Sequence, residues 1–227
     1  MGRSVTILAA LLGAAFLVSL GVWQLQRLEW KEGVLAEMDA RLHGAAVPVP
    51  SDPDPARDGY LRIVSDGSLG REELHVLAST KSRGPVYRVV SPFVLEDGRR
   101  VLVDRGTVPT GEKDAERAAG PARLVGNLHW PEERDRFTPP DEAVTNIWYA
   151  RDVAPMAAAL DTEPVLVVAA SIQMASGERQ GATPLPLDAS GIPNDHLGYA
   201  ITWFGLAAGW IAMAGAFVLR GRPEQAA

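Results

Sequence analysis

The sequence predicts an α+β membrane protein in which two transmembrane helices flank a mainly antiparallel β domain with short helices. Three features of the 227 residues support this fold class. An uncharged apolar run lies near each end, several strand-like runs lie between them, and turn residues separate several of those runs. The length allows one domain of ordinary size in addition to the two apolar segments.

The first apolar run extends from Val5 to Leu25 and carries no charge. A helix needs about 20 apolar residues to cross a bilayer, so a transmembrane helix is predicted over 5–25, with residues 1–4 in the cytoplasm. A cleavable signal peptide is the alternative. The run favours a retained span because it is longer than a usual signal core and ends in Trp23 rather than in small residues.

The predicted extracytoplasmic domain, 26–196, begins with a helix that continues out of the first span. Leu28, Leu35 and Leu42 recur every seven residues, which is typical of an amphipathic helix. The prolines between 48 and 55 then predict an extended linker.

Strand-like runs and one alanine-rich stretch make up the rest of the domain. The runs are 61–64, 74–79, 86–95, 100–106, 123–130 and 165–174. Short strands at this spacing predict an antiparallel sheet that curls into a barrel-like form. The stretch 150–160 is predicted to be a short helix.

The second apolar run extends from Leu197 to Leu219 and also carries no charge. It predicts a second transmembrane helix over 197–219, followed by a cytoplasmic tail over 220–227. The chain is therefore predicted to be a multi-pass protein of the cell's inner membrane.

Basic residues beside the two spans predict the orientation. Arg3, Arg220 and Arg222 lie on the sides of the two tails, which favours both termini in the cytoplasm. Arg27 and Lys31 lie just beyond the first span and nearly balance this count. A long domain can nevertheless be translocated whatever its charge.

Composition excludes several classes of function. Between the two tails the chain carries 27 acidic and 19 basic residues, a net charge of −8, so no nucleic-acid partner is predicted. The absence of cysteine from the sequence excludes disulfides, thiolate metal sites and thiol redox chemistry. A copper chaperone with a CxxxC site and a thioredoxin-like reductase are therefore excluded.

Catalytic motifs are missing from the sequence. It contains no G-x-S-x-G nucleophile elbow, no phosphate-binding glycine-rich loop and no H-E-x-x-H. His43, His75 and His129 are scattered, so we interpret them as surface or strand-face histidines. The chain is predicted not to be an enzyme.

The stretch GVWQLQRLEWK, 21–31, covers the exit of the first span. On a helix, Trp23 and Arg27 share a face with Trp30 or Lys31. One interpretation is an interface anchor, with tryptophans at headgroup depth and cations paired with lipid phosphates. The other is a docking surface for a partner subunit or for a ligand that bears propionates.

The stretch VLVDRGTVP, 101–109, is predicted to be a buried strand that ends in a charged pair and a turn glycine. Its residue types alone indicate a salt bridge at a strand end.

The stretch PNDHLGYAITWF, 193–204, opens the second span. Asn194 or Asp195 is predicted to cap this helix, which places His196 in its first turn. The positive end of the helix dipole favours a neutral imidazole there, free to bind a metal. Alternatively, His196 only caps the helix and bonds Asp195 or lipid.

Two faces of the second span differ in residue size. The aromatic face contains His196, Tyr199, Ala200, Trp203, Ala207 and Trp210. The small-residue face contains Gly198, Thr202, Gly205, Gly209, Ala212 and Ala216. Small residues allow close helix approach, so the second face is predicted to pack on Ala9 and Gly13 of the first span. The aromatic face would then remain for lipid, a partner or a flat aromatic ligand.

With these motifs, the chain resembles the Surfeit locus protein 1 family over nearly its whole length. The resemblance rests on the stretches 21–31 and 101–109, on GNLHWPEE at 126–133, and on PNDHLGYAITWFGLA from 193. The chain departs from the family where Asp104-Arg105-Gly106-Thr107 replaces Asn-Arg-Gly-Trp, and where Asn194-Asp195-His196 replaces Asn-Asn-His.

The resemblance implies an assembly factor for haem-copper cytochrome c oxidase that helps insert haem a into the catalytic subunit. It implies that His196 is the axial ligand of the haem iron, with Tyr199 and Trp203 beside the ring and Arg27 and Trp23 completing the binding surface. The expected partners are the oxidase catalytic subunit, haem A synthase and membrane lipid.

Two other functions stay open from the sequence. The chain could be a scaffold without a cofactor that stabilises an intermediate of oxidase assembly. It could also be a two-span sensor, which the tail from Arg220 to Ala227 disfavours because it leaves no room for an output domain.

Overall fold

The computed structural model describes residues 3–81 and 83–220 and divides the chain into two compact units. The helical unit comprises Met1–Glu37 and Ala189–Ala227, and the barrel unit comprises Met38–Asp188. The barrel unit is thus shorter at both ends than the predicted domain, 26–196. The predicted tail, apart from Arg220, lies outside the described residues.

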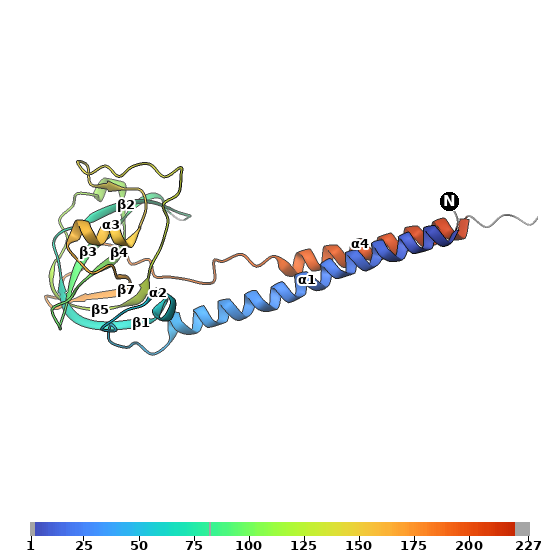
Figure 1. The fold of residues 1–227 in the computed structure, drawn as a ribbon. Helices are drawn as coiled ribbons and strands as arrows, with labels where there is room; N and C mark the ends of the chain where they lie inside the picture. The colour runs from blue at the N-terminus through green and yellow to red at the C-terminus, as the bar shows by residue number, and fades with distance from the viewer. Residues whose placement is uncertain (1–2, 82, 221–227) are drawn as a thin grey trace, which may run out of the picture. The chain divides into compact units, whose positions relative to one another are not determined.

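The helical unit is built on two long helices, α1 (Arg3–His43) and α4 (His196–Arg220) (Figure 1). Both are long and apolar enough to cross a membrane, and most of their side chains are exposed rather than buried in a protein core. The helix predicted to continue out of the first span is confirmed, because α1 runs without a break through both segments. Its heptad residue Leu42 is buried, within the barrel unit.

Helices α1 and α4 pack against each other in antiparallel orientation (Figure 1). The ring of Trp210 lies over Gly13, and the ring of Phe204 lies over Gly21, where an added Cβ would meet ring atoms at 2.8 and 2.6 Å. Trp210 Nε1 also donates to the carbonyl of Ala10 at 2.9 Å. Aromatic rings on α4 therefore fill the space that glycines leave on α1.

The predicted packing of the small-residue face of α4 on the first span is wrong. A Cβ added at Gly198, Gly205 or Gly209 would meet nothing within 4 Å. The buried positions of α4 are instead Ala200 and Ala207, on the predicted aromatic face. The physical reason is that rings set over glycines bury more apolar area and make more dispersion contacts than two small-residue faces would.

The barrel unit contains seven strands and short helices. The strands are β1 (Arg62–Leu69), β2 (Leu74–Thr80), β3 (Gly84–Leu95), β4 (Arg100–Pro109), β5 (Gly120–His129), β6 (Ile147–Trp148) and β7 (Leu166–Met174). The helical segments are α2 (Pro55–Asp58), the 3-10 turn η1 (Thr110–Glu112) and α3 (Val153–Leu160). Every predicted strand and the predicted short helix correspond to one of these elements.

The strands form one curled sheet in the order β1-β5-β7-β4-β3-β2-β6. A further antiparallel pairing of β1 with β3 closes β1, β5, β7, β4 and β3 into a barrel. Strands β2 and β6 extend the sheet beyond β3. The pairings β4–β7 and β2–β6 are parallel and the others are antiparallel. The predicted mainly antiparallel, barrel-like sheet is therefore confirmed.

Strand alternation divides the core of this unit between two sides of the barrel wall. On β4, Val101 and Val103 belong to one buried cluster, and Leu102 belongs to a second that includes Met156 of α3. Successive side chains of a strand point to opposite faces, so one apolar strand supplies both clusters. Helix α3 covers the second cluster, and both faces of β4 are buried.

Helix α2 lies at the end of the proline-rich stretch that was predicted to be wholly extended. The side chain of Asp54 accepts from the amides of Ala56 and Arg57 at 2.9 and 2.8 Å. Pro55 follows as the first helical residue, where its missing N–H costs nothing. The capping aspartate and this proline together start a single helical turn.

Candidate functional site

His196 is the first residue of α4, and its ring contacts α1. Its Nδ1 lies 2.7 Å from Oε1 of Gln24, and the imidazole is half-buried. In the described residues, no group forms a hydrogen bond with Nε2. The structure therefore presents His196 with one ring nitrogen engaged inside the helix pair and the other available.

Gln24 is a site residue that the sequence reasoning missed. Its side chain is buried between α1 and α4, with an exposed fraction of 9%. A polar, uncharged side chain within an apolar span is itself a signal, because such groups hydrogen-bond across helices. The stretch 21–31 was interpreted from its tryptophans and cations, which do not form this contact.

The start of α4 distinguishes the two predicted caps, Asn194 and Asp195. The carbonyl of Asp195 accepts from the amide of Tyr199 at 3.2 Å, which puts Asp195 at the helix boundary. The side-chain oxygen of Asn194 is buried and, among the described residues, accepts no hydrogen bond. Capping by Asn194 is therefore wrong. Lys31 Nζ donates to the carbonyl of Pro193 and ties this turn to α1.

The other predicted ligand-binding residues lie on both helices near this point. Tyr199 is 57% exposed and Trp203 is half-buried, two turns from the start of α4. On α1, Trp23 is 52% exposed and the guanidinium of Arg27 lies 4.2 Å from the ring centroid of Trp30. Gln24 lies one residue from Trp23 and one turn from Arg27, so these residues lie at the same level along α1, where Gln24 is buried and the other two are exposed.

Contrary to the sequence prediction, only part of the aromatic face of α4 remains free for lipid, a partner or a ligand. Ala200 and Ala207 are buried against α1, and Trp210 covers Gly13. Tyr199, at the edge of this packed strip, stays exposed. A flat ligand at His196 would therefore lie beside the helix pair, against Tyr199, rather than along the full aromatic face.

The motif 101–109 forms a buried network of charges in the barrel unit. Asp104, fully buried, accepts from Arg88 Nε at 2.6 Å, from Arg151 Nη1 at 3.3 Å and from the amide of Gly106 at 3.0 Å. The predicted salt bridge at a strand end is therefore wrong, because β4 continues to Pro109 and the carboxylate of Asp104 is shared by two arginines from other segments. Removing one partner from such a group is costly.

Arg105, also fully buried, bonds groups from three distant parts of the unit. Its guanidinium donates to Glu73 Oε1 at 2.9 Å, to Gln180 Oε1 at 3.0 Å and to the carbonyl of Ala118 at 3.0 Å. Burial lowers the pKa of Arg105 to about 10, against the opposing charge of Glu73. The guanidinium therefore stays protonated at neutral pH and holds these segments together.

Glu73 is the shared carboxylate of this network. It also accepts from Arg117 Nη1 at 2.6 Å and from His75 Nε2 at 3.2 Å. Burial pushes the pKa of Glu73 upward, but the hydrogen bond from His75 and the charges of Arg105 and Arg117 outweigh it and hold the pKa below its ordinary value. Asn146 Nδ2 lies 3.3 Å from His75 Nδ1, so the imidazole is fixed on both sides.

Gly106 and Gln180 attach the segment after β7, residues 175–188, to β4; we call this segment the connector. Gly106 has φ +109°, and an added Cβ would lie 2.0 Å from the carbonyl oxygen of Thr183. Thr107 and Thr183 exchange backbone hydrogen bonds of 2.7 and 2.9 Å. Gly106 is thus not a turn glycine as predicted: it lies within β4, beside an irregularity in the pairing with β3, and it allows the close approach of another chain segment.

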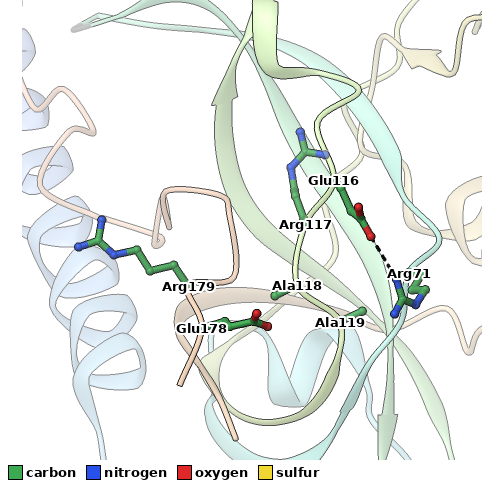
Figure 2. Close-up of a pocket in the computed structure, with 7 residues that line it drawn as sticks. All are labelled: Arg71, Glu116, Arg117, Ala118, Ala119, Glu178 and Arg179. Carbon is green, nitrogen blue, oxygen red and sulfur yellow. Dashed lines mark ion pairs between the residues drawn. The ribbon is translucent and has the colours of Figure 1, made fainter. Parts of the chain in front are cut away.

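A polar pocket of about 510 Å³ opens on the barrel unit beside this network (Figure 2). Its lining residues are Arg71, Glu116, Arg117, Ala118, Ala119, Glu178 and Arg179. Arg71 and Glu116 form an exposed ion pair at 3.5 Å across its rim. The lining contains no imidazole and no hydroxyl, and its titratable side chains are the carboxylates of Glu116 and Glu178 and three guanidinium groups.

The remaining histidines do not form a metal site. His43 is exposed beside Asp39, His75 is buried against Glu73, and His129 stacks on Tyr60 with ring centroids 5.6 Å apart. Burial, followed by the charge of Arg151, lowers the pKa of His129. In residues 3–81 and 83–220, no three histidine, aspartate or glutamate side chains gather as ligands for a metal ion.

Comparison with known proteins places this architecture in a family. The family model described as the SURF1 family matches residues 11–208. Surfeit locus protein 1 of Xenopus tropicalis is 31% identical over 83% of this chain and 67% of its own length. Surfeit locus protein 1 of Homo sapiens is 30% identical over 90% of this chain and 74% of its own. A SURF1-like protein of Monosiga brevicollis is 31% identical over 86% and 80%. The match includes the stretches 101–109 and 193–204, most of α1 and about the first half of α4, and the chain therefore belongs to the SURF1 family, known as assembly factors of cytochrome c oxidase.

Proposed function

We propose that the protein assists the delivery or insertion of haem a into the catalytic subunit of a haem-copper cytochrome c oxidase, without catalytic turnover of its own. Membership of the SURF1 family supports the role in oxidase assembly. The contact between His196 and Gln24 is the observation that carries the haem-specific part. It leaves Nε2 of a half-buried imidazole available where α4 begins.

The residues at this point fit a haem. His196 would hold the iron through Nε2, which is ordinary haem ligation. When bound, the haem would supply an iron centre for redox chemistry in the oxidase, whereas the role of this chain is to hold and release it. Tyr199, 57% exposed, offers an aromatic wall beside the ligand nitrogen, and Trp203 extends it. Arg27 and Trp23 are exposed on α1 at the level of Gln24, and a guanidinium suits propionates.

The proposed setting is the inner membrane of the cell. Helices α1 and α4 would cross it as a pair, with both termini in the cytoplasm and the barrel unit outside. His196, at the start of α4, would then lie at the outer membrane surface, where the apolar ring of a haem and its charged propionates both find suitable surroundings. The partners proposed are the oxidase catalytic subunit and haem A synthase, with lipid around the helix pair.

Replacement of His196 by alanine tests this function. The full chain is purified from cells that synthesise haem a, and the Soret spectrum of His196→Ala is compared with wild type at equal protein concentration. We expect loss of bound haem from a protein that still folds: the backbone bond from Tyr199 to Asp195 that starts the helix is untouched, and the cost is the lost hydrogen bond of the buried Gln24 amide. His43→Ala is the matched control, since His43 is an exposed histidine on α1.

Two outcomes would contradict the proposal. An unchanged Soret spectrum in His196→Ala removes the residue from haem binding and favours the scaffold interpretation. Normal haem a content of the oxidase after deletion of the gene removes the delivery role as well. The expected deletion phenotype is low haem a in the oxidase while its polypeptides remain detectable.

A further inference from the structure

Gln24 is the buried polar group that contacts the proposed iron ligand. Its Oε1 lies 2.7 Å from His196 Nδ1, and 91% of its surface is covered in the helical unit. The neighbouring buried positions of this helix, Ala14 and Gly21, are small and apolar. A glutamine amide enclosed there is costly unless it is hydrogen-bonded, and the contact with His196 supplies a bond.

The chemistry of the two groups fixes the state of the ring. An amide oxygen is an acceptor only, so the hydrogen bond requires the proton on His196 Nδ1. In a neutral imidazole the other nitrogen, Nε2, then carries the lone pair. The same bond sets the direction of the ring, because the glutamine side chain is enclosed between two packed helices.

We infer that Gln24 is the positioning residue of the haem ligand: it holds His196 in the Nδ1–H form and directs Nε2 away from α1. This inference rests on the proposed function and deepens it. Outer-shell acceptors of this kind orient a ligating histidine and raise its basicity. It also gives a role to the stretch 21–31 that neither the anchor nor the docking interpretation covers, because Gln24 is the polar residue of that stretch whose side chain is buried against α4.

If Gln24 has only a packing role, its Leu and Glu substitutions should rank in the opposite order of severity from the one that a positioning role predicts. If the side chain only filled space between helices, Gln24→Leu would be tolerated and Gln24→Glu would be harmful, since a buried carboxylate costs more than a buried isobutyl group. If it positions His196, Gln24→Glu keeps an acceptor for Nδ1–H and Gln24→Leu removes it. Gln26→Leu is the matched control, the same substitution at an exposed glutamine two residues away.

The first measurement uses the full chain without haem, labelled with ¹⁵N at histidine and held in lipid nanodiscs. His43→Ala, His75→Ala and His196→Ala variants assign the resonances. The expected result for wild type is a protonated Nδ1 and an unprotonated Nε2 at His196. The expected result for Gln24→Leu is a mixture of the two tautomers. A protonated Nε2 in the wild type, or no change in Gln24→Leu, would overturn the inference without any reference to haem.

The second measurement is titration of the same proteins with haem a, followed by the Soret band and by the midpoint potential of the bound iron. Loss of an outer-shell partner typically weakens metal binding by about 10- to 100-fold, and we expect this for Gln24→Leu. Gln24→Glu should bind within a few-fold of wild type and at a lower midpoint potential, because a carboxylate acceptor makes the imidazole a stronger donor.

The outcomes separate this inference from the proposed function. Gln24→Leu binding like wild type while Gln24→Glu fails would show packing only, and the positioning role would be rejected. If His196→Ala binds haem a as well as wild type, the proposed function fails, and the tautomer measurement still decides whether Gln24 controls the ring. If Gln24→Leu does not fold, Gln24→Glu and the wild-type tautomer carry the test.

Discussion

Replacement of Gly106 by alanine tests whether the 101–109 motif holds the connector. Gly106 has φ +109°, and the new Cβ would meet the carbonyl oxygen of Thr183 at 2.0 Å and Cα of Pro184 at 2.6 Å. Both are backbone atoms, so no change of side-chain rotamer relieves the clash. The connector must move away from β4, and its backbone bonds with Thr107 must break.

The magnitude follows from the two effects. A left-handed backbone costs a residue with a Cβ about 1–2 kcal/mol. The two hydrogen bonds between Thr107 and Thr183 contribute about 0.5–1.5 kcal/mol each. Their loss together with the strain gives about 2–5 kcal/mol against the closed connector. At about 1.4 kcal/mol per factor of ten, amide exchange at Thr183 should accelerate by at least about 30-fold.

Hydrogen exchange with mass spectrometry on the full chain in detergent measures this effect. Peptides from the connector and from β4 should lose protection, whereas peptides from β5 should change much less. Gly98→Ala is the matched control, because Gly98 has φ +86° but open space around an added Cβ. Equal protection of Thr183 in Gly106→Ala and wild type would refute the reasoning. Equal loss of protection in Gly106→Ala and Gly98→Ala would show that backbone strain acts without the clash.

Two further predictions concern the helix pair and the network around Glu73. Gly21→Leu should separate α1 from α4, since an added Cβ already meets the Phe204 ring at 2.6 Å and overpacking costs about 1–3 kcal/mol. Adding Phe204→Ala should restore thermal stability of the full chain in detergent, and additive losses would contradict ring-over-glycine packing. For Glu73, the lowered pKa means that the unfolded chain binds more protons as the pH falls below the ordinary value of 4.5, so stability should fall there. Glu73→Gln should flatten that dependence in urea titrations between neutral and acidic pH, and an unchanged slope would remove Glu73 as its source.

The strands and the barrel could be predicted because their signals are local. Short runs of apolar and β-branched residues mark β3, β4 and β7 within their own sequence, and turn residues such as those at 96–98 separate β3 from β4. The role of Arg105 could not be predicted in this way. Its partners Glu73 and Gln180 lie 32 and 75 residues away, and nothing in a single sequence pairs charges over such distances. Only the folded barrel brings them together.

The face of α4 that contacts α1 was assigned wrongly for a different reason. Both faces of α4 have the period of a helix, so periodicity cannot choose between them. The choice depends on α1, where Gly13 and Gly21 leave room for the rings of Trp210 and Phe204. A rule that pairs small residues with small residues therefore selected the face that is exposed. The contact of Gln24 with His196 was missed because it exists only in the correct register.

Two of the stretches that carry the family resemblance, 101–109 and 21–31, contact segments that follow each other in the chain, each within its own unit. Arg105 and Gly106 fix the connector at Gln180 and Thr183, before the barrel unit ends. Lys31 and Gln24 fix the start of α4 at Pro193 and His196, after the helical unit resumes. A stretch fixed at both ends transmits a disturbance poorly if each end is held by its own contacts. Gly106→Ala should then change exchange at Thr183 while the tautomer of His196 stays as in wild type, and Gln24→Leu should do the reverse. A change of both readouts in either variant would mean that connector and ligand are coupled, and the barrel unit would then have a direct part in holding haem.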